Sequence, residues 1–268
     1  MSATCTIGDL RSALLLAATQ ATSRREVCIC ILAVTAVVFL ALVLTWTATR
    51  RRLGTELWAH GINITPGDAP PIRMTLLHEE PCIRILEGFV TSAEAEHLVT
   101  TYRTQLTRST VSASTGAGGL TETSQARTSS TVFLPEGNAD DVVHDIEIRA
   151  MLLTGIPIKF WETFQLTHYT QGQEYKPHFD WFDASENNRT LTLFVYLNDV
   201  APEQGGATEF TKLGIKVQPQ LGRALLWYNC SAKGAAVVCD ADTEHAGTPP
   251  LSGEKYALNC WARTKHIR

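Results

Sequence analysis

The sequence predicts a β-rich α+β domain, built as a β-sandwich or jelly roll with helices packed on one sheet, behind a single N-terminal transmembrane helix. Three features support this prediction. Residues 27–47 form an apolar stretch that carries no charge. Between this stretch and Pro157, apolar residues recur at helical spacing in two segments. Beyond Pro157 the segments alternate, or are rich in β-branched and aromatic residues, and turn clusters separate them as between short strands.

The uncharged stretch at residues 27–47 has the length of a membrane span, since about 20 apolar residues cross the hydrocarbon core of a bilayer. Arginines flank both ends, and Trp46 lies where an interfacial aromatic residue is common. A buried core helix rarely runs so long without a polar face. The apolar part of a cleaved signal peptide is normally shorter, at ~7–15 residues. We therefore expect a membrane anchor, whose orientation the flanking arginines do not decide.

The anchor divides the chain into an N-terminal tail at residues 1–26, a stem or linker at 48–75 and a soluble domain at 76–268, where about 190 residues suffice for one hydrophobic core. Hydrophobic residues make up 44% of the chain and charged residues 19%, which excludes a disordered or fibrous protein. The net charge of −4 argues against a nucleic-acid partner, because affinity for phosphate backbones needs an excess of Lys and Arg. The seven cysteines form no Cys-x-x-Cys pair and predict no zinc knuckle.

Local signals place two helices in the first part of the soluble domain. A capping box at Thr91–Glu94 opens a helix whose apolar face extends to Leu106. A second helix is expected over residues 138–153, ended by Gly155. Residues 107–131 are mostly Ser, Thr, Gly and Ala, and we expect a mobile loop there, either a linker or a lid. Strands are expected at residues 160–169, 190–197, 223–228 and 255–263.

The candidate chemistry centres on the triplet His178-Phe179-Asp180. In a strand, residues i and i+2 point to the same face, so that the His178 imidazole and the Asp180 carboxylate can bind one metal ion together. His245 lies much further along the chain and can supply a third ligand. Two histidines and one carboxylate form the facial triad of non-haem Fe(II) oxygenases, with open positions for a co-substrate and O₂. Taken alone, such a triplet often arises by chance.

A lysine in the last expected strand strengthens this interpretation. The period-two rule places on one strand face Lys255, Ala257, Asn259, Trp261 and Arg263. If that face points inward, an unpaired Lys255 ammonium is costly to bury. A dicarboxylate that chelates the metal at one end would place its other carboxylate beside this ammonium. Alternatively, Lys255 snorkels to solvent at the start of the strand.

Several motifs between about Leu76 and the C-terminus together resemble one family. These motifs are His168-Tyr169, Gly172–Tyr175, Pro177–Asp180, Tyr196–Asp199, Gly205–Phe210, Gly222–Leu226, His245–Gly247 and Gly253–Tyr256. The chain resembles the prolyl 4-hydroxylase branch of the 2-oxoglutarate- and Fe(II)-dependent dioxygenases. The resemblance implies a double-stranded β-helix, which is a jelly roll, with flanking helices.

The resemblance also implies roles for individual residues. The implied Fe(II) ligands are His178, Asp180 and His245, which together with Lys255 form the catalytic set. Lys255 would pair with the distal carboxylate of 2-oxoglutarate, and Tyr169 would hydrogen-bond the same carboxylate. Thr192 lies on the strand that would wall the co-substrate pocket. The implied peptide-contacting residues are Arg127, Tyr175, Arg189 and Trp261. Alternatively, these two aromatic residues belong to the core and these two arginines are solvated; the loop before Arg127 would be the substrate lid.

The implied activity is hydroxylation of peptidyl proline at C4, with release of succinate and CO₂. Fe(II), 2-oxoglutarate and O₂ would take part, and ascorbate would be the reductant. The expected partners are a proline-containing peptide or protein and, through the N-terminal helix, a membrane, but no nucleic acid. Two alternatives remain open: a 2-oxoglutarate oxygenase acting on lysine or on an alkylated nucleobase, and a non-catalytic jelly-roll binding module. Membrane-anchored relatives imply a lumenal catalytic domain in the endoplasmic reticulum or Golgi.

One position departs from the family pattern. Thr248 follows His-Ala-Gly, where the family commonly has Cys, so that a family-like disulfide to that position is absent. Cys230 and Cys239 can pair with each other or remain free thiols, which leaves the redox compartment open. In a lumenal domain, glycosylation acceptor triplets would begin at Asn63, Asn188 and Asn229.

Overall fold

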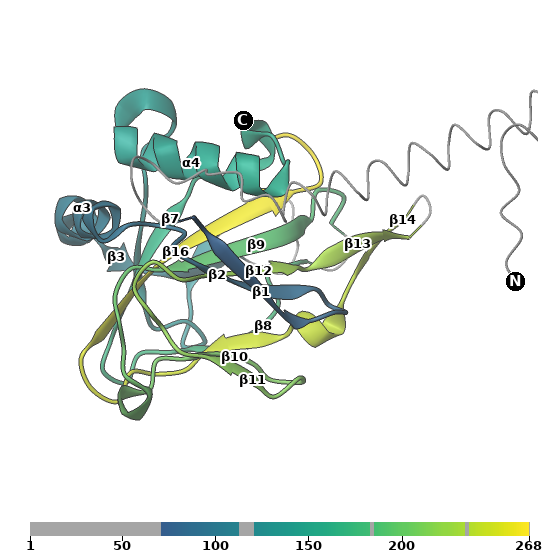
Figure 1. The fold of residues 1–268 in the computed structure, drawn as a ribbon. Coiled ribbons are helices and arrows are strands. Elements are labelled where there is room, and N and C mark those ends of the chain that lie inside the picture. The colour runs from purple at the N-terminus through teal and green to yellow at the C-terminus, as the bar shows by residue number, and fades with distance from the viewer. Residues whose placement is uncertain (1–70, 113–120, 183–184, 234–235, 268) are drawn as a thin grey trace, which may run out of the picture. The chain divides into compact units, whose positions relative to one another are not determined.

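The computed structural model describes residues 71–112, 121–182, 185–233 and 236–267 (Figure 1). The predicted tail, the predicted anchor at residues 27–47 and nearly all of the predicted stem lie outside these described residues. Within the described ranges, no helix is both long and apolar enough to cross a membrane.

Two antiparallel sheets form the body of the described domain. The larger has eight strands in the order β1-β2-β12-β9-β16-β7-β6-β3, and the smaller has four in the order β11-β10-β15-β8. The strands of the larger sheet are β1 Arg73–His78, β2 Ile83–Glu87, β12 Ala224–Tyr228, β9 Arg189–Tyr196, β16 Glu254–Arg263, β7 Gln165–Thr170, β6 Ser130–Phe133 and β3 Thr107–Arg108. Those of the smaller sheet are β11 Ile215–Val217, β10 Thr208–Phe210, β15 His245–Gly247 and β8 Tyr175–His178. Several neighbouring pairs, such as β2 with β12 and β7 with β16, join strands far apart in the chain, as in a jelly roll, which agrees with the predicted fold class.

Two hairpins stand apart from these sheets. One pairs β4 Thr110–Ser112 with β5 Thr121–Thr123, and the other pairs β13 Cys230–Lys233 with β14 Ala236–Cys239. Cys230 and Cys239 form a disulfide across the second hairpin, which settles the pairing that the sequence left open. Among the described residues, Cys82 and Cys260 take part in no disulfide.

The two α-helices of the described ranges are α3 Ser92–Tyr102 and α4 Asp141–Thr154. Figure 1 shows α4 along one side of the larger sheet, with the smaller sheet along the other. The predicted capping box of α3 is present: Thr91 accepts from the Glu94 backbone N–H, and the Glu94 side chain accepts from the Thr91 N–H. Helix α4 ends at Gly155, which adopts the left-handed conformation that favours glycine. Arg149 of α4 makes a buried bidentate ion pair with Glu94, which joins the two helices.

Short 3-10 turns lie between the longer elements. They are η1 Arg103–Gln105, η2 Gly137–Ala139, η3 Ile158–Phe160, η4 Pro202–Gln204 and η5 Ala241–Thr243. Two of these turns show that predicted boundaries were wrong. The first helix was expected to extend to Leu106, but α3 ends before η1 and Leu106 is extended. The strand expected from residue 160 begins only at Gln165, after η3.

Two further sequence-based boundaries were wrong. The segment 107–131, predicted as a loop, contains β3, β4 and β5 and the start of β6, because several of its threonines and Val111 pair into strands rather than remain solvated. Strand β1 begins at Arg73, inside the predicted stem, since residues 73–76 pair with β2. The folded domain therefore begins earlier than Leu76.

The main hydrophobic core lies between the two sheets. Phe194 and Tyr196 of β9, Leu225 and Trp227 of β12 and Phe210 of β10 belong to one buried cluster. Their rings pack edge to face, with centroids 5.3 Å apart in both the Phe194–Tyr196 and the Phe210–Trp227 pairs. This packing holds the small sheet against the large one and leaves a cavity beside it.

Candidate active site

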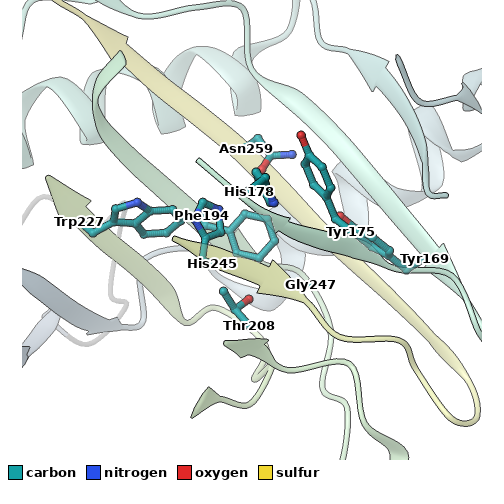
Figure 2. A pocket seen from close by; sticks show the side chains of 9 residues that line it. All are labelled: Tyr169, Tyr175, His178, Phe194, Thr208, Trp227, His245, Gly247 and Asn259. Atoms are coloured by element: carbon teal, nitrogen blue, oxygen red, sulfur yellow. The ribbon is translucent and has the colours of Figure 1, made fainter. Parts of the chain in front are cut away.

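A cavity that opens to solvent, with an empty volume of ≈ 290 Å³ including its open part, lies between the two sheets. Its lining residues come from strands of both sheets and are Tyr169, Tyr175, His178, Phe194, Thr208, Trp227, His245, Gly247 and Asn259. Figure 2 shows the two histidines near the middle of this set, with Trp227 toward one end and Tyr169 toward the other.

The structure brings His178, Asp180 and His245 together at this cavity. His178 of β8 and His245 of β15 are cross-strand partners, and their ring centroids are 4.3 Å apart. The Asp180 carboxylate lies between them, with Oδ1 3.8 Å from His178 Nε2 and Oδ2 3.7 Å from His245 Nε2. One ligand atom from each residue lies within 4.8 Å of the other two, which is close enough for a single metal ion to bind all three.

The expectation that His178 and Asp180 share one strand face is wrong. Strand β8 ends at His178, so that Asp180 lies beyond it and does not share a strand face with the histidine. Instead, the hydroxyl of Thr192 on β9 donates a hydrogen bond of 2.7 Å to Asp180 Oδ2. The carboxylate is therefore aimed from the opposite sheet rather than by the period-two rule.

The protonation states of the three residues suit metal binding. Nδ1 of His178 lies 2.8 Å from the Lys176 carbonyl, and Nδ1 of His245 lies 3.0 Å from the Thr243 carbonyl. Because a carbonyl only accepts, each Nδ1 carries the proton and each Nε2 keeps its lone pair for a metal. Burial lowers the pKa of His178 to about 3. Two imidazoles and one carboxylate with open positions are a donor set that fits Fe(II).

The pKa of Asp180 reflects two opposing influences. Burial raises it, but interactions with the two imidazoles of His245 and His178, the charge of Arg189 and the Thr192 hydrogen bond outweigh burial. The pKa of Asp180 therefore lies below its ordinary value, and the group is a carboxylate at neutral pH.

Lys255 is fully buried, with 1% of its surface exposed, so the snorkelling alternative is wrong. Its ammonium lies 5.4 Å from the Tyr169 ring centroid, 5.2 Å from that of Phe194 and 5.5 Å from that of Tyr196. No carboxylate among the described residues pairs with it. Burial lowers the pKa of Lys255 to about 7. A buried cation enclosed by rings, two of which line the cavity, fits an anionic ligand.

The two hydroxyl residues implied for the co-substrate pocket lie in different places. Tyr169 lines the cavity, and burial raises its pKa. Thr192 is not among the lining residues, and its hydroxyl donates to Asp180. Thr208 was missed, although it lines the cavity and accepts a hydrogen bond of 2.8 Å from the Tyr196 hydroxyl. The available signal was its position two residues before Phe210, which places both side chains on the inner face of β10.

The four residues implied for peptide contact form two pairs, of which Tyr175 and Arg127 lie beside His178. Tyr175 stacks on His178 with ring centroids 3.4 Å apart, and the Arg127 guanidinium lies 5.1 Å from the Tyr175 ring centroid. Arg189 forms a two-pronged ion pair with Glu162 at 2.6 and 2.8 Å. The Arg189 guanidinium also stacks on Trp261, 3.8 Å from the ring centroid. The alternative that both arginines are solvated is therefore wrong.

Comparison with known proteins agrees with this geometry. A family model described as the 2OG-Fe(II) oxygenase superfamily matches residues 164–263. Probable prolyl 4-hydroxylase 6 of Arabidopsis thaliana is 31% identical over 221 residues, which cover 74% of this chain and 73% of the relative. The chain belongs to the prolyl 4-hydroxylase family. It is therefore an Fe(II)- and 2-oxoglutarate-dependent oxygenase of that type.

Other members of the prolyl 4-hydroxylase family differ more in length. Probable prolyl 4-hydroxylase 7 of Arabidopsis thaliana is 32% identical, with 73% of this chain and 66% of the relative covered. Prolyl 4-hydroxylase subunit alpha-1 of Rattus norvegicus is 35% identical over 192 residues, which cover 68% of this chain but only 34% of that subunit. The chain thus spans about a third of the animal subunit.

A solved structure shares the fold of this family member. The viral collagen prolyl hydroxylase of Paramecium bursaria Chlorella virus-1, in its 2OG complex, superposes with a TM-score of 0.55. The two chains are 24% identical, and the match covers 68% of this chain and 96% of the viral one. At this identity the likeness concerns the fold alone.

Two of the three glycosylation acceptors predicted for this prolyl 4-hydroxylase are buried. Asn188 is 6% exposed, and its amide donates to the Phe182 carbonyl and accepts from the Phe182 N–H. Asn229 is 0% exposed. Neither side chain can accept a glycan in the folded domain, and Asn63 lies outside the described residues.

Proposed function

We propose that this chain hydroxylates peptidyl proline at C4 and couples that reaction to the conversion of 2-oxoglutarate and O₂ into succinate and CO₂. One O₂ oxygen enters the new hydroxyl group and the other enters succinate, so that atoms balance. The supporting observation is a cavity at which three candidate metal ligands converge. Beside it lies the buried Lys255 ammonium, with which no carboxylate of the described residues forms an ion pair. We further propose ascorbate as the reductant that restores Fe(II).

The metal would be held by Nε2 of His178, Nε2 of His245 and the carboxylate of Asp180. When bound, Fe(II) supplies the activation of O₂ that protein side chains cannot perform. The backbone carbonyls of Lys176 and Thr243 hold the two imidazoles in the ligating tautomer. The chain thereby prepares its donor atoms before the metal arrives.

The co-substrate would be oriented by Lys255. Its ammonium would pair with the distal carboxylate of 2-oxoglutarate, and hydroxyls of Tyr169 and Thr208 are the nearby polar groups of the cavity wall. The aromatic rings around Lys255 exclude water, so that the ammonium gains more from an anionic partner than a surface lysine would. The carboxylate would offset the cost of burying an unpaired cation.

The peptide would meet donors that the folded chain leaves unused. Arg127 Nε and Trp261 Nε1 are buried and have no hydrogen-bond partner among the described residues. Buried donors normally have partners, and the carbonyl groups of a peptide would supply them. Glu162 holds the fork of Arg189, whose face stacks on Trp261, so Arg189 would orient the indole rather than grip the peptide directly.

Product analysis tests this proposal directly. We expect succinate release to depend on Fe(II) and to rise with proline-containing peptides, whose products gain one oxygen at proline C4. Matched peptides with proline replaced by alanine should stimulate no such release. Oxygen found on lysine would point to another branch of 2-oxoglutarate oxygenases, and the absence of any turnover would support a binding module.

We also propose that residues 27–47 anchor the enzyme in the membrane of the endoplasmic reticulum or Golgi, with the catalytic domain in the lumen. The Cys230–Cys239 disulfide supports an oxidising compartment. The buried Asn188 and Asn229 lend no support. A lumenal domain should resist protease in intact microsomes, and any endoglycosidase shift should vanish in the Asn63→Gln variant. A C-terminal tag accessible from the cytosol would contradict the proposed topology.

A further inference from the structure

A chain of three buried hydrogen bonds ends on the carboxylate of Asp180. Trp227 Nε1 donates to Asn229 Oδ1 at 2.7 Å, and Asn229 Nδ2 donates to Thr192 Oγ1 at 2.8 Å. Thr192 Oγ1 in turn donates to Asp180 Oδ2 at 2.7 Å. All four side chains are buried, with exposed fractions of 4% or less. Water therefore does not compete for these groups.

The direction of this chain is fixed by chemistry at both ends. An indole N–H can only donate, so the amide of Asn229 must turn its oxygen toward Trp227 and its NH₂ toward Thr192. The amide then occupies the acceptor side of the Thr192 oxygen, and the hydroxyl proton must point to the carboxylate. A carboxylate can only accept, so that each bond supports the next.

Asp180 depends on this chain because its own backbone does not hold it in a strand. It lies beyond the end of β8, and the Thr192 hydroxyl is the one hydrogen-bond donor to its carboxylate within the described residues. By contrast, His178 and His245 are each fixed by strand pairing and by a backbone carbonyl. Of the three candidate ligands, Asp180 therefore depends most on a single side-chain hydrogen bond for its orientation.

Asn229 itself is held firmly. Its backbone N–H donates to the Thr190 carbonyl at 2.9 Å, and its carbonyl accepts from Asp240 N–H at 2.8 Å. The Cys230–Cys239 disulfide closes the hairpin that begins at the next residue. Trp227, at the start of the chain, also packs against His245, with ring centroids 4.8 Å apart. Through Thr192 and Trp227, the chain thus contacts two of the three candidate ligands, Asp180 and His245.

We propose that Thr192 and Asn229 are positioning residues that orient the Asp180 carboxylate for the metal. This rests on the proposed function, because it assumes that His178, Asp180 and His245 bind a divalent cation. Neither residue lines the cavity, and Asn229 serves this role instead of accepting a glycan. Groups that orient a metal ligand typically contribute 10- to 100-fold to affinity, at the order of magnitude.

The first test compares two variants that each delete one hydroxyl donating to an aspartate. Thr192→Val removes the donor to Asp180, and Tyr102→Phe removes the 2.6 Å donor to Asp140 Oδ2 at the start of α4. Mn(II) binding to the metal-free full chain is measured by electron paramagnetic resonance, and thermal unfolding is followed alongside. We expect the Mn(II) dissociation constant to rise by roughly 10- to 100-fold in Thr192→Val and to stay unchanged in Tyr102→Phe. Thr192→Ser should retain wild-type binding.

The second test changes the direction of the chain without changing its shape. Asn229→Asp keeps an oxygen for Trp227 but replaces the NH₂ by an acceptor, which draws the Thr192 proton away from Asp180. We expect weaker Mn(II) binding here too, with an unchanged 2-oxoglutarate KM at saturating metal. Wild-type Mn(II) affinity in a folded Thr192→Val or Asn229→Asp variant would overturn the inference. If the wild-type chain bound no Mn(II), the proposed function would fail instead.

Discussion

The two ends of the candidate site, the metal-ligand cluster and the buried Lys255, differ in whether their polar groups already have partners. At the metal end, each candidate ligand already has a partner: the two histidines face backbone carbonyls, and Asp180 accepts from Thr192. At the other end, Lys255 has rings around it and no carboxylate partner among the described residues. The metal end is therefore organised before anything binds, whereas the lysine end carries a desolvated charge.

This difference explains why the metal end favours a cation and the lysine end an anion. Pre-formed hydrogen bonds at the metal end reduce the cost of ordering side chains when a cation binds. At the lysine end, an anionic ligand stabilises the ammonium, because it supplies the charged partner that the buried group otherwise lacks. Changes at the two ends should consequently separate metal affinity from co-substrate affinity.

The largest effect is expected at the metal end, from His178→Ala. This variant removes one of three protein donors, so we expect both Fe(II) retention and succinate release to fall below detection. His97→Ala provides a matched control, since His97 belongs to α3 and pairs with Asp140 rather than with the cavity. Iron content by mass spectrometry and coupled succinate assays measure the two properties. A His178→Ala variant that kept its iron would refute the assignment of the ligand.

Lys255→Ala should weaken the binding of 2-oxoglutarate at the lysine end alone. Removing one partner of a buried ion pair costs about 3–5 kcal/mol. Since 1.4 kcal/mol is about tenfold, the apparent affinity for 2-oxoglutarate should fall by roughly two to three orders of magnitude. Metal binding by His178, Asp180 and His245 should remain nearly intact. The measurements are the 2-oxoglutarate dependence of succinate release and the metal content, and an unchanged co-substrate dependence would remove Lys255 from the pocket.

The pH dependence sharpens the same comparison. Burial lowers the pKa of Lys255 to about 7, so rising pH converts the free ammonium to a neutral amine that cannot pair with a carboxylate. At saturating metal, we expect 2-oxoglutarate affinity to fall about tenfold between pH 6 and pH 8. Isothermal titration at several pH values measures this fall. Lys255→Arg should bind the co-substrate less well, because its fork is bulkier, but without this pH dependence, because a guanidinium stays charged.

The smallest effect is expected from the disulfide behind the metal end. A Cys230→Ser, Cys239→Ser double variant loses a cross-link spanning 9 residues, which should lower stability by about 2–3 kcal/mol. Metal affinity should fall only a few-fold, because the backbone hydrogen bonds of Asn229 remain. Thermal unfolding and Mn(II) binding test both parts. A loss of metal binding as severe as in His178→Ala would show that the hairpin, rather than Thr192, positions the carboxylate.

Local sequence signals predicted the elements whose cause is local. The capping box at Thr91 and the helix stop at Gly155 were correct, because each depends on neighbouring backbone groups within one helical turn. The strands β9, β12 and β16 were placed within a residue of their observed bounds, since alternating apolar residues mark a buried sheet face.

Elements that depend on distant partners were missed. The strands within residues 107–131 pair with each other or with β6, and β1 exists through its pairing with β2. Such short segments carry too few apolar residues to show a recognisable strand pattern in the sequence. Their pairing satisfies backbone groups only once the rest of the sheet has formed.

By itself, the sequence determined the chemistry available to this protein: two imidazoles, a carboxylate and an ammonium, in motifs that resemble prolyl 4-hydroxylases. Residue type alone sets which atoms can donate, accept or bind a metal. The tertiary structure alone decided how these groups face one another. It paired His178 with His245, aimed Asp180 through Thr192, and enclosed Lys255 among rings from β7 and β9. These contacts join residues far apart in the chain, so global strand pairing selects them and no local pattern encodes them.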